Sequence, residues 1–159
     1  MFEHISASLP RDCPVAIVGL RSRGDELARR LIDRLTAAGR RDLHHGTLDI
    51  TLYSDDLSKR AVQPAVRATE IDFNLDDAWV LLVDDVLNTG RTIRSALDAL
   101  MDYGRPAVIR LAVLVDRGGR ELPIAPDFVG KRLPLGPGEG RRVYVELSEA
   151  DGRDRVYLK

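Results

Sequence analysis

The sequence predicts a single α/β domain with a central, mainly parallel sheet flanked by helices. Short, near-continuous apolar runs recur along the chain, which is typical of strands buried on both faces of a parallel sheet. Amphipathic segments lie between them, and strand–helix–strand alternation with right-handed crossovers produces such a sheet. The length of 159 residues corresponds to one domain, which buries roughly 70% of the surface that its unfolded chain would expose.

Periodicity places the elements along the chain. Apolar or alternating runs predict strands over residues 15–20, 46–53, 79–84, 108–115, 143–147 and 156–158. An apolar face at helical spacing predicts helices over 24–38 and 89–103, each followed by a glycine. Residues 54–69 are polar and aperiodic, and a loop of that length in a compact domain is typical of a functional lid or a disordered segment.

Composition describes an ordinary globular protein, with 44% hydrophobic and 31% charged residues and a net charge of -1. This balance produces no overall field that would require a nucleic-acid partner. No apolar run approaches the ~20 residues that span a bilayer, and the start of the chain lacks the pattern of a secretory signal. The single cysteine, Cys13, cannot form an internal disulfide, and His44-His45 has no third ligand at metal-binding spacing. We therefore expect a cytoplasmic protein.

The most informative segment is the apolar strand 79–84 and the turn that follows it. The strand ends in two adjacent carboxylates, Asp84 and Asp85, which suit the hydroxyl groups of a sugar. Shortly after them, Thr89-Gly-Arg-Thr92 supplies two hydroxyls, a glycine and an arginine, which is more than a helix cap requires. Free backbone N–H groups at such a turn bind phosphate. The segment predicts a site for a ligand that is both a sugar diol and a phosphate monoester, such as phosphoribosyl pyrophosphate (PRPP).

Charged or turn residues follow three of the predicted strands. The carboxyl ends of parallel strands meet at one edge of a sheet, where α/β proteins bind their ligands. The three motifs are Arg21-Ser22-Arg23-Gly24, Asp84-Asp85 and Asp116-Arg117-Gly118. Each motif alone is also compatible with a solvated surface or a capped turn, so their convergence is what predicts an active site. The charged residues of the loop 54–69, compatible with a lid or with a solvated loop, are Asp55, Asp56, Lys59 and Arg60.

Three other classes of protein place acids after an apolar strand. A P-loop ATPase requires G-x-x-x-x-G-K-[ST], which is absent, and the glycines at 136, 138 and 140 precede no helix, as a Rossmann dinucleotide site would require. A phosphoacceptor receiver domain often carries its acidic pair after the first strand, whereas this pair lies at mid-chain. These comparisons favour the sugar-phosphate site.

Residues 82–92, Leu-Val-Asp-Asp-Val-Leu-Asn-Thr-Gly-Arg-Thr, carry the motif of a known superfamily. With them, the chain from about residue 15 to 147 resembles the type I phosphoribosyltransferases. The segments 48–53 (Leu-Asp-Ile-Thr-Leu-Tyr) and 120–124 (Arg-Glu-Leu-Pro-Ile) narrow the resemblance to the PyrR family. Its members are pyrimidine-operon attenuation regulators that are also uracil phosphoribosyltransferases.

The resemblance implies a role for each matching position. Asp84 and Asp85 would bind the ribose hydroxyls, and Ser22 and Arg23, with Arg21 and Gly24 beside them, would face the pyrophosphate. Arg23, Asp84 and Asp85 would be the catalytic set. The loop that holds the 5′-phosphate would comprise Val86, Leu87, Asn88, Thr89, Gly90, Arg91 and Thr92. Arg117 and Val143 would border the base, and Arg120 and Lys131 would belong to an RNA-binding face.

The activity implied is the conversion of uracil and PRPP to UMP and pyrophosphate, with Mg²⁺ bound mainly through PRPP and no direct protein site for the metal. The alternative is an RNA-binding regulator that senses UMP and has weak or no catalysis. The expected partners are PRPP, uracil, UMP and a pyrimidine leader mRNA, with no membrane and a homodimer or higher homo-oligomer. The expected organisation is a core over about 15–120 and a small carboxyl-terminal hood over about 121–159.

Several positions depart from the family pattern. The family usually has a Tyr, an Arg and a His at the positions of Asn88, Ser54 and Gly119, and commonly a basic residue at Ala125. It generally also has an additional amino-terminal helix, whereas only residues 1–14 precede the first predicted strand here. Since the catalytic set is nearly complete and the RNA-binding set is depleted, the sequence favours an enzyme over an attenuator. Asn88 and Gly119 leave open a relative that uses another base or acts only as a nucleotide sensor.

Overall fold

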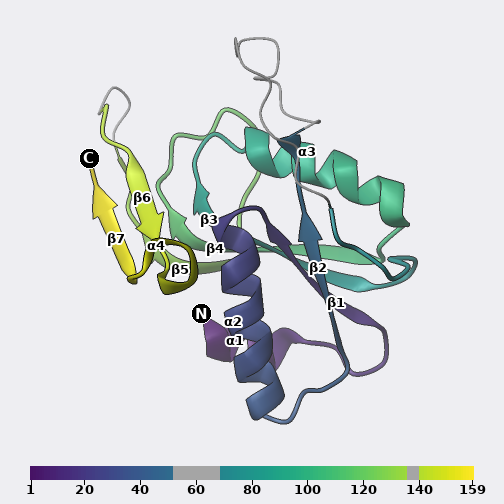
Figure 1. Ribbon diagram of the computed structural model, residues 1–159. Helices are drawn as coiled ribbons and strands as arrows, with labels where there is room; N and C mark the ends of the chain where they lie inside the picture. The colour runs from purple at the N-terminus through teal and green to yellow at the C-terminus, as the bar shows by residue number, and fades with distance from the viewer. Residues whose placement is uncertain (52–68, 136–139) are drawn as a thin grey trace.

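The computed structural model describes residues 1–51, 69–135 and 140–159. Its main sheet has five parallel strands in the order β2-β1-β3-β4-β5 (Figure 1). They are β1 (Val15–Leu20), β2 (Leu43–Leu48), β3 (Trp79–Leu87), β4 (Val108–Asp116) and β5 (Phe128–Arg132). The predicted α/β fold with a central parallel sheet is therefore confirmed.

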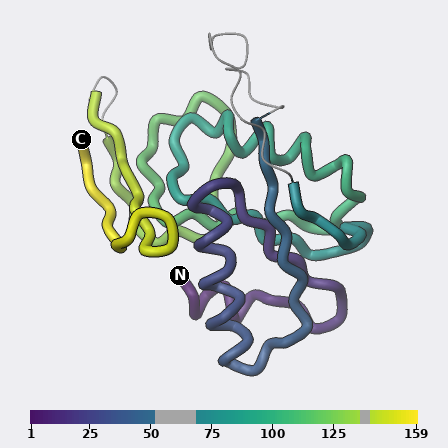
Figure 2. The backbone as a smooth tube through the Cα atoms, in the orientation of Figure 1, coloured from purple at the N-terminus to yellow at the C-terminus, as the bar shows by residue number. Residues whose placement is uncertain are grey.

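Helices cover both faces of this sheet. The helices α1 (Phe2–Ser8) and α2 (Arg23–Ala37) pack on one face, and α3 (Arg91–Leu100), continued by the 3₁₀ turn η3 (Met101–Tyr103), packs on the other. A separate antiparallel hairpin consists of β6 (Val143–Glu146) and β7 (Arg155–Leu158), joined by the short helix α4 (Ser148–Asp151). The backbone trace brings this hairpin alongside α2 (Figure 2). None of the helices within the described ranges has the length and apolar character needed to cross a bilayer.

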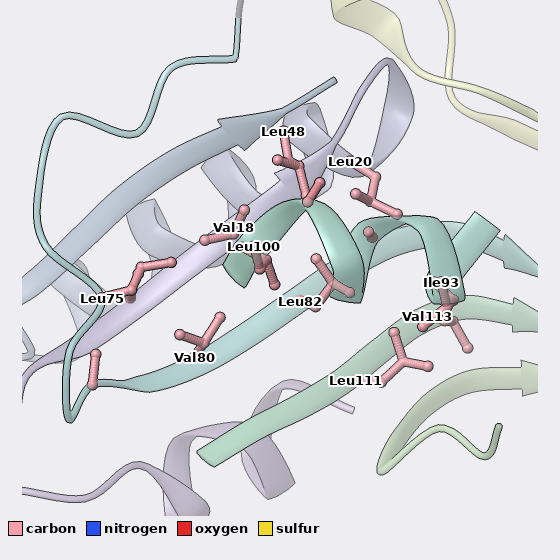
Figure 3. Close-up of a cluster of buried hydrophobic side chains, with 14 of the residues drawn as sticks. Val18, Leu20, Leu48, Leu75, Val80, Leu82, Ile93, Leu100, Leu111 and Val113 are labelled. Carbon is pink, nitrogen blue, oxygen red and sulfur yellow. The ribbon is translucent and has the colours of Figure 1, made fainter. Parts of the chain in front are cut away.

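The core follows the apolar pattern of the strands. Alternate residues of β1 and β3 enter opposite clusters, because successive side chains of a strand point to opposite faces. In the cluster under α3, Ile93 and Leu100 of the helix lie with Leu82 of β3 and Val113 of β4 (Figure 3). The strands that carry the predicted site residues are therefore anchored in the core, which gives the sheet edge a rigid support.

Element boundaries differ from the sequence prediction where local turns compete with the pattern. The strand predicted over 46–53 lies instead at Leu43–Leu48. It ends there because the Asp49 carboxylate accepts a hydrogen bond from the Thr51 amide at 2.8 Å, which forms a turn. The helix predicted from residue 89 begins at Arg91, because Gly90 has φ +93° and cannot belong to a right-handed helix. The sequence did not predict α1, α4 or β5.

Candidate functional site

The three motifs predicted to converge lie at one edge of the main sheet. The register pairs Gly19 with Val83 and Leu87 with Asp116, so the carboxyl ends of β1, β3 and β4 lie side by side. Arg21 directly follows β1, and Arg117 directly follows β4. The acids at 84 and 85 lie within the last residues of β3. The structure thus brings all three motifs together.

A direct backbone contact joins the start of α2 to the acidic strand. A methyl group added at Gly24 would lie 2.5 Å from the Val83 carbonyl oxygen and 3.1 Å from the Asp84 Cα. Similarly, a Cβ at Gly19 would lie 2.4 Å from the Asp25 Cα. Both distances are too short for a real side chain. Glycine at 24 therefore allows the loop 21–24, which runs into the first turn of α2, to lie directly against Asp84, and glycine at 19 allows the start of α2 to pack directly on β1.

The two acids have different environments. Asp84 is 7% exposed, and its Oδ1 accepts a hydrogen bond from the Asp85 amide at 2.9 Å. Asp85 is half-buried, and its Oδ1 accepts from the Val86 amide at 2.8 Å. Burial, followed by the charge of the Asp85 carboxylate, raises the pKa of Asp84 well above its ordinary value. Asp85 is therefore the more accessible of the two carboxylates for a sugar hydroxyl.

The segment 86–92 forms the connection from β3 to α3. Leu87 is buried in the core, so only its backbone is available to a ligand. The left-handed Gly90 precedes the first turn of α3, and the Thr89 hydroxyl accepts a hydrogen bond from the Arg91 amide at 3.3 Å. The first amide groups of a helix have no partner within the helix and attract anions. The segment therefore presents backbone amides at the start of α3, and its role as a phosphate site stays a prediction.

Three predicted arginines carry unsatisfied donors. Arg21 pairs with Glu70 at 2.8 Å, and Arg23 donates to Asp151 at 2.7 Å and to the Ser22 hydroxyl at 2.9 Å. Arg21, Arg23 and Arg117 nevertheless each have a buried Nε with no hydrogen-bond partner among the described residues. A buried donor without an acceptor is costly, so a native structure usually supplies one from a ligand or water. The three guanidinium groups thus favour an anionic ligand at this edge.

The carboxyl-terminal hairpin borders the same edge. β6, which includes the half-buried Val143, contacts β3. Its helix α4 is held on α2 by Arg30, which pairs with Glu149 at 2.6 Å and with Asp154 at 2.7 Å. The hydrogen bond from Arg30 lowers the pKa of Glu149 to about 2. The hairpin is consequently docked beside the loop 21–24 rather than elsewhere on the sheet.

The remaining predicted residues separate into two groups. The four charged residues of the proposed lid, Asp55, Asp56, Lys59 and Arg60, lie outside the described residues. Lys131 is exposed on β5, whereas Arg120 is half-buried and its guanidinium hydrogen-bonds to protein acceptors. Glu70 and Asp151, which pair with two of the site arginines, were missed because nothing in their local sequence indicates these distant partners.

Two positions that depart from the family pattern are neighbours in space. A Cβ at Gly119 would lie 2.8 Å from the Asn88 Oδ1. Gly119 also has φ +73°, where a side chain is unfavourable. The Asn88 amide therefore occupies the space that a side chain at position 119 would need, so the two departures belong to the same small region.

Replacing Asp84 by asparagine is expected to stabilise the fold at neutral pH. An unfolded aspartate loses its proton near pH 3.9, whereas buried Asp84 keeps its proton to higher pH. Above about pH 3.9 the unfolded aspartate ionises more readily than the folded one, so the free energy of unfolding falls as pH rises. Below that pH both forms are protonated and this loss of stability is absent. The asparagine side chain would retain an Oδ1 acceptor for the Asp85 amide. Thermal unfolding should show a higher Tm for Asp84→Asn at pH 7 and little difference at pH 3.5; an equal gain at both would contradict this account.

Comparisons with known proteins show the family to which the chain belongs. The model of the phosphoribosyl transferase domain family matches residues 2–136. A bifunctional protein PyrR of Akkermansia muciniphila is 51% identical over 158 residues, covering 99% of this chain and 86% of the relative. A protein of the same name from Deinococcus radiodurans is 56% identical over 144 residues, covering 91% and 78%.

Solved structures support the fold alone. A hypoxanthine phosphoribosyltransferase of Trypanosoma cruzi, in a ternary substrates complex, superimposes with a TM-score of 0.65 at 19% identity. The superposition covers 84% of this chain and 73% of that one. A hypoxanthine phosphoribosyltransferase of Staphylococcus aureus gives a TM-score of 0.62 at 20% identity, covering 88% and 71%.

Proposed function

Because the chain belongs to the phosphoribosyl transferase domain family and, within it, to the bifunctional PyrR proteins, we propose that it converts uracil and PRPP to UMP and pyrophosphate. The observation that carries this proposal is the convergence of three guanidinium groups with unsatisfied Nε donors, two adjacent carboxylates and a left-handed turn at one sheet edge. A ribose with a phosphate at one end and a diphosphate at the other matches these groups in kind.

Each part of PRPP has a proposed partner. The Asp85 carboxylate, with Asp84 behind it, accepts hydrogen bonds from the ribose hydroxyls. The turn Thr89 to Thr92 binds the 5′-phosphate through backbone amides and hydroxyls. Arg23, with Arg21 and Ser22 of the loop 21–24, faces the diphosphate, and Arg117 and Val143 border the base. Glu70 pairs with Arg21 and Asp151 pairs with Arg23, and these ion pairs hold the two arginines in place.

The reaction is a displacement at C1′ of PRPP. The bond between C1′ and uracil N1 forms, the bond from C1′ to the diphosphate oxygen breaks, and the diphosphate leaves with the electron pair. The proton on N1 is released to solvent. Positive charge on the ribose and negative charge on the diphosphate both increase toward the transition state. Arg23 stabilises the leaving group, and the Asp84–Asp85 pair fixes the ribose, because preorganised charges lower the barrier without rearrangement.

Mg²⁺ fits this site as a companion of PRPP. Within the described ranges, no three His, Cys, Asp or Glu side chains form a group that could hold a metal ion by themselves. Mg²⁺ commonly binds through one or two carboxylates together with substrate phosphates, so here it would be held mainly by the PRPP phosphates, with Asp85 as the accessible carboxylate nearby. When bound, the ion would neutralise diphosphate charge.

The direct test is incubation of the purified protein with radiolabelled uracil, PRPP and Mg²⁺. Formation of labelled UMP, dependent on both PRPP and Mg²⁺, is the expected result. Absence of UMP, with turnover of hypoxanthine or another base in parallel reactions, would overturn uracil as the substrate and leave the phosphoribosyl site in place. Failure with every base would overturn the enzymatic proposal.

A second candidate function is UMP-dependent binding of a pyrimidine leader RNA, which the word bifunctional in the relatives' names favours. Lys131 is exposed at the carboxyl end of β5 and is available to phosphate groups, and its neighbour Arg132 is exposed but pairs with Asp116 at 3.7 Å. Gel shifts with a leader RNA at increasing salt, with and without UMP, test this function. Phosphate-driven binding weakens steeply with salt, and Lys131→Gln should weaken it further.

In keeping with the family, we also propose a cytoplasmic homodimer or larger homo-oligomer.

A further inference from the structure

Arg120 lies where three backbone segments meet at the edge that carries the site. Its Nη1 donates to the Asn88 carbonyl at 2.8 Å, its Nε to the Ile124 carbonyl at 2.9 Å, and its Nη2 to the Asp116 carboxylate at 2.7 Å. Asn88 precedes the turn 89–92, and Asp116 is the last residue of β4. One side chain therefore connects the β3–α3 turn to the neighbouring strand.

The residues after Arg120 contact the same turn. The amides of Glu121 and Leu122 both donate to the Thr89 carbonyl, at 2.9 and 3.1 Å. Side-chain atoms of Leu122 and Ile124 lie 3.4 Å from the position that a Cβ of Gly90 would occupy. The backbone from Asn88 to Gly90 is thus fixed from outside by the segment 120–124.

We infer that Arg120 is a positioning residue for the turn that binds the 5′-phosphate, and that it acts through the Asn88 carbonyl. The inference rests on the proposed function for the identity of the ligand, but the contacts exist without it. A phosphate site made of backbone amides works only when the turn is already in the binding conformation, since ordering it on binding would reduce affinity. Arg120 keeps the turn in that conformation.

The chemistry requires arginine. A planar guanidinium presents five donors in fixed directions, so it can satisfy three acceptors from three segments at once. The charge has a buried counter-ion, since Asp116 is 8% exposed. Lysine would supply the charge but not the divergent hydrogen bonds, and glutamine would supply neither. These three donors are also occupied by protein, so they are not offered to RNA phosphates.

The test compares Arg120→Gln and Arg120→Lys with the unchanged protein, using UMP binding by calorimetry and hydrogen exchange of the amides at 89–92. We expect UMP to bind about tenfold more weakly to Arg120→Gln, about 1.4 kcal/mol, with faster exchange of these amides. Arg120→Lys should be intermediate, and the KM for uracil should stay unchanged. The matched control is Arg110→Gln, which removes an ion pair between β4 and Asp127, before β5 and away from the turn.

The outcomes separate this inference from the proposed function. If the unchanged protein does not bind UMP, the proposed function fails, and the exchange of amides 89–92 alone decides whether Arg120 holds the turn. Weaker UMP binding without faster exchange would mean that Arg120 contacts the ligand directly, which overturns positioning. Unchanged binding and exchange in a folded Arg120→Gln would overturn it as well. If Arg120→Gln does not fold, UMP binding and the exchange of amides 89–92 are compared between Arg120→Lys and the unchanged protein.

Discussion

Arg23→Ala is expected to lower kcat/KM for PRPP by about 100-fold or more, which corresponds to roughly 3 kcal/mol of lost transition-state stabilisation. The physical reason is that Arg23, in the role proposed for it, stabilises the leaving diphosphate, and its buried Nε has no partner among the described residues. Asp85→Asn should produce a loss of similar size, because the amide accepts weaker hydrogen bonds from the ribose hydroxyls than the carboxylate does. Steady-state kinetics with PRPP as the varied substrate measures both.

The control for this experiment is Arg41→Ala, which removes an exposed arginine between α2 and β2. It should retain the parental kcat/KM. If Arg23→Ala or Asp85→Asn stays within about threefold of the parent, well short of the loss of one preorganised contact, the roles assigned to them are wrong. A fall in stability alone would appear as a lower Tm with unchanged kinetics at low temperature.

Gly24→Ala is expected to destabilise the fold by about 3 kcal/mol, or a Tm lower by roughly 6–12 °C for a chain of this size. The new methyl group would lie 2.5 Å from the Val83 carbonyl oxygen, and neither the strand nor the first turn of α2 is free to move. Any folded protein should also have a raised KM for PRPP, because the loop 21–24 is pushed away from Asp84.

Gly140→Ala provides the matched control, since a Cβ there meets no atom of the described residues within 4 Å and the backbone has no positive φ. Its Tm should equal that of the parent. Equal Tm values for Gly24→Ala and the parent would show that the contact between α2 and β3 relaxes easily, and the close approach would then not explain glycine at this position.

Much of the fold and of the candidate site was predictable from periodicity. The strand 15–20 lies where the apolar run placed it, and β3 and β4 extend only slightly past their predicted ends. β5 was missed because Phe128–Arg132 contains a glycine and two basic residues at an exposed edge, where no apolar run is required. The boundary errors at Thr51 and Gly90 arose from a side-chain hydrogen bond and a left-handed residue, which hydrophobic patterning does not register.

The sequence by itself determined the α/β class, the acidic strand end and the turn at 89–92, because these depend on residues that are consecutive or a few positions apart. Only the tertiary structure decided that Arg23 meets Asp151, that Arg21 meets Glu70 and that Arg120 holds the Asn88 carbonyl. Such contacts join segments separated by long stretches of chain. The packing of helices and strands determines which of these residues meet, and a local pattern of residue types does not contain that information.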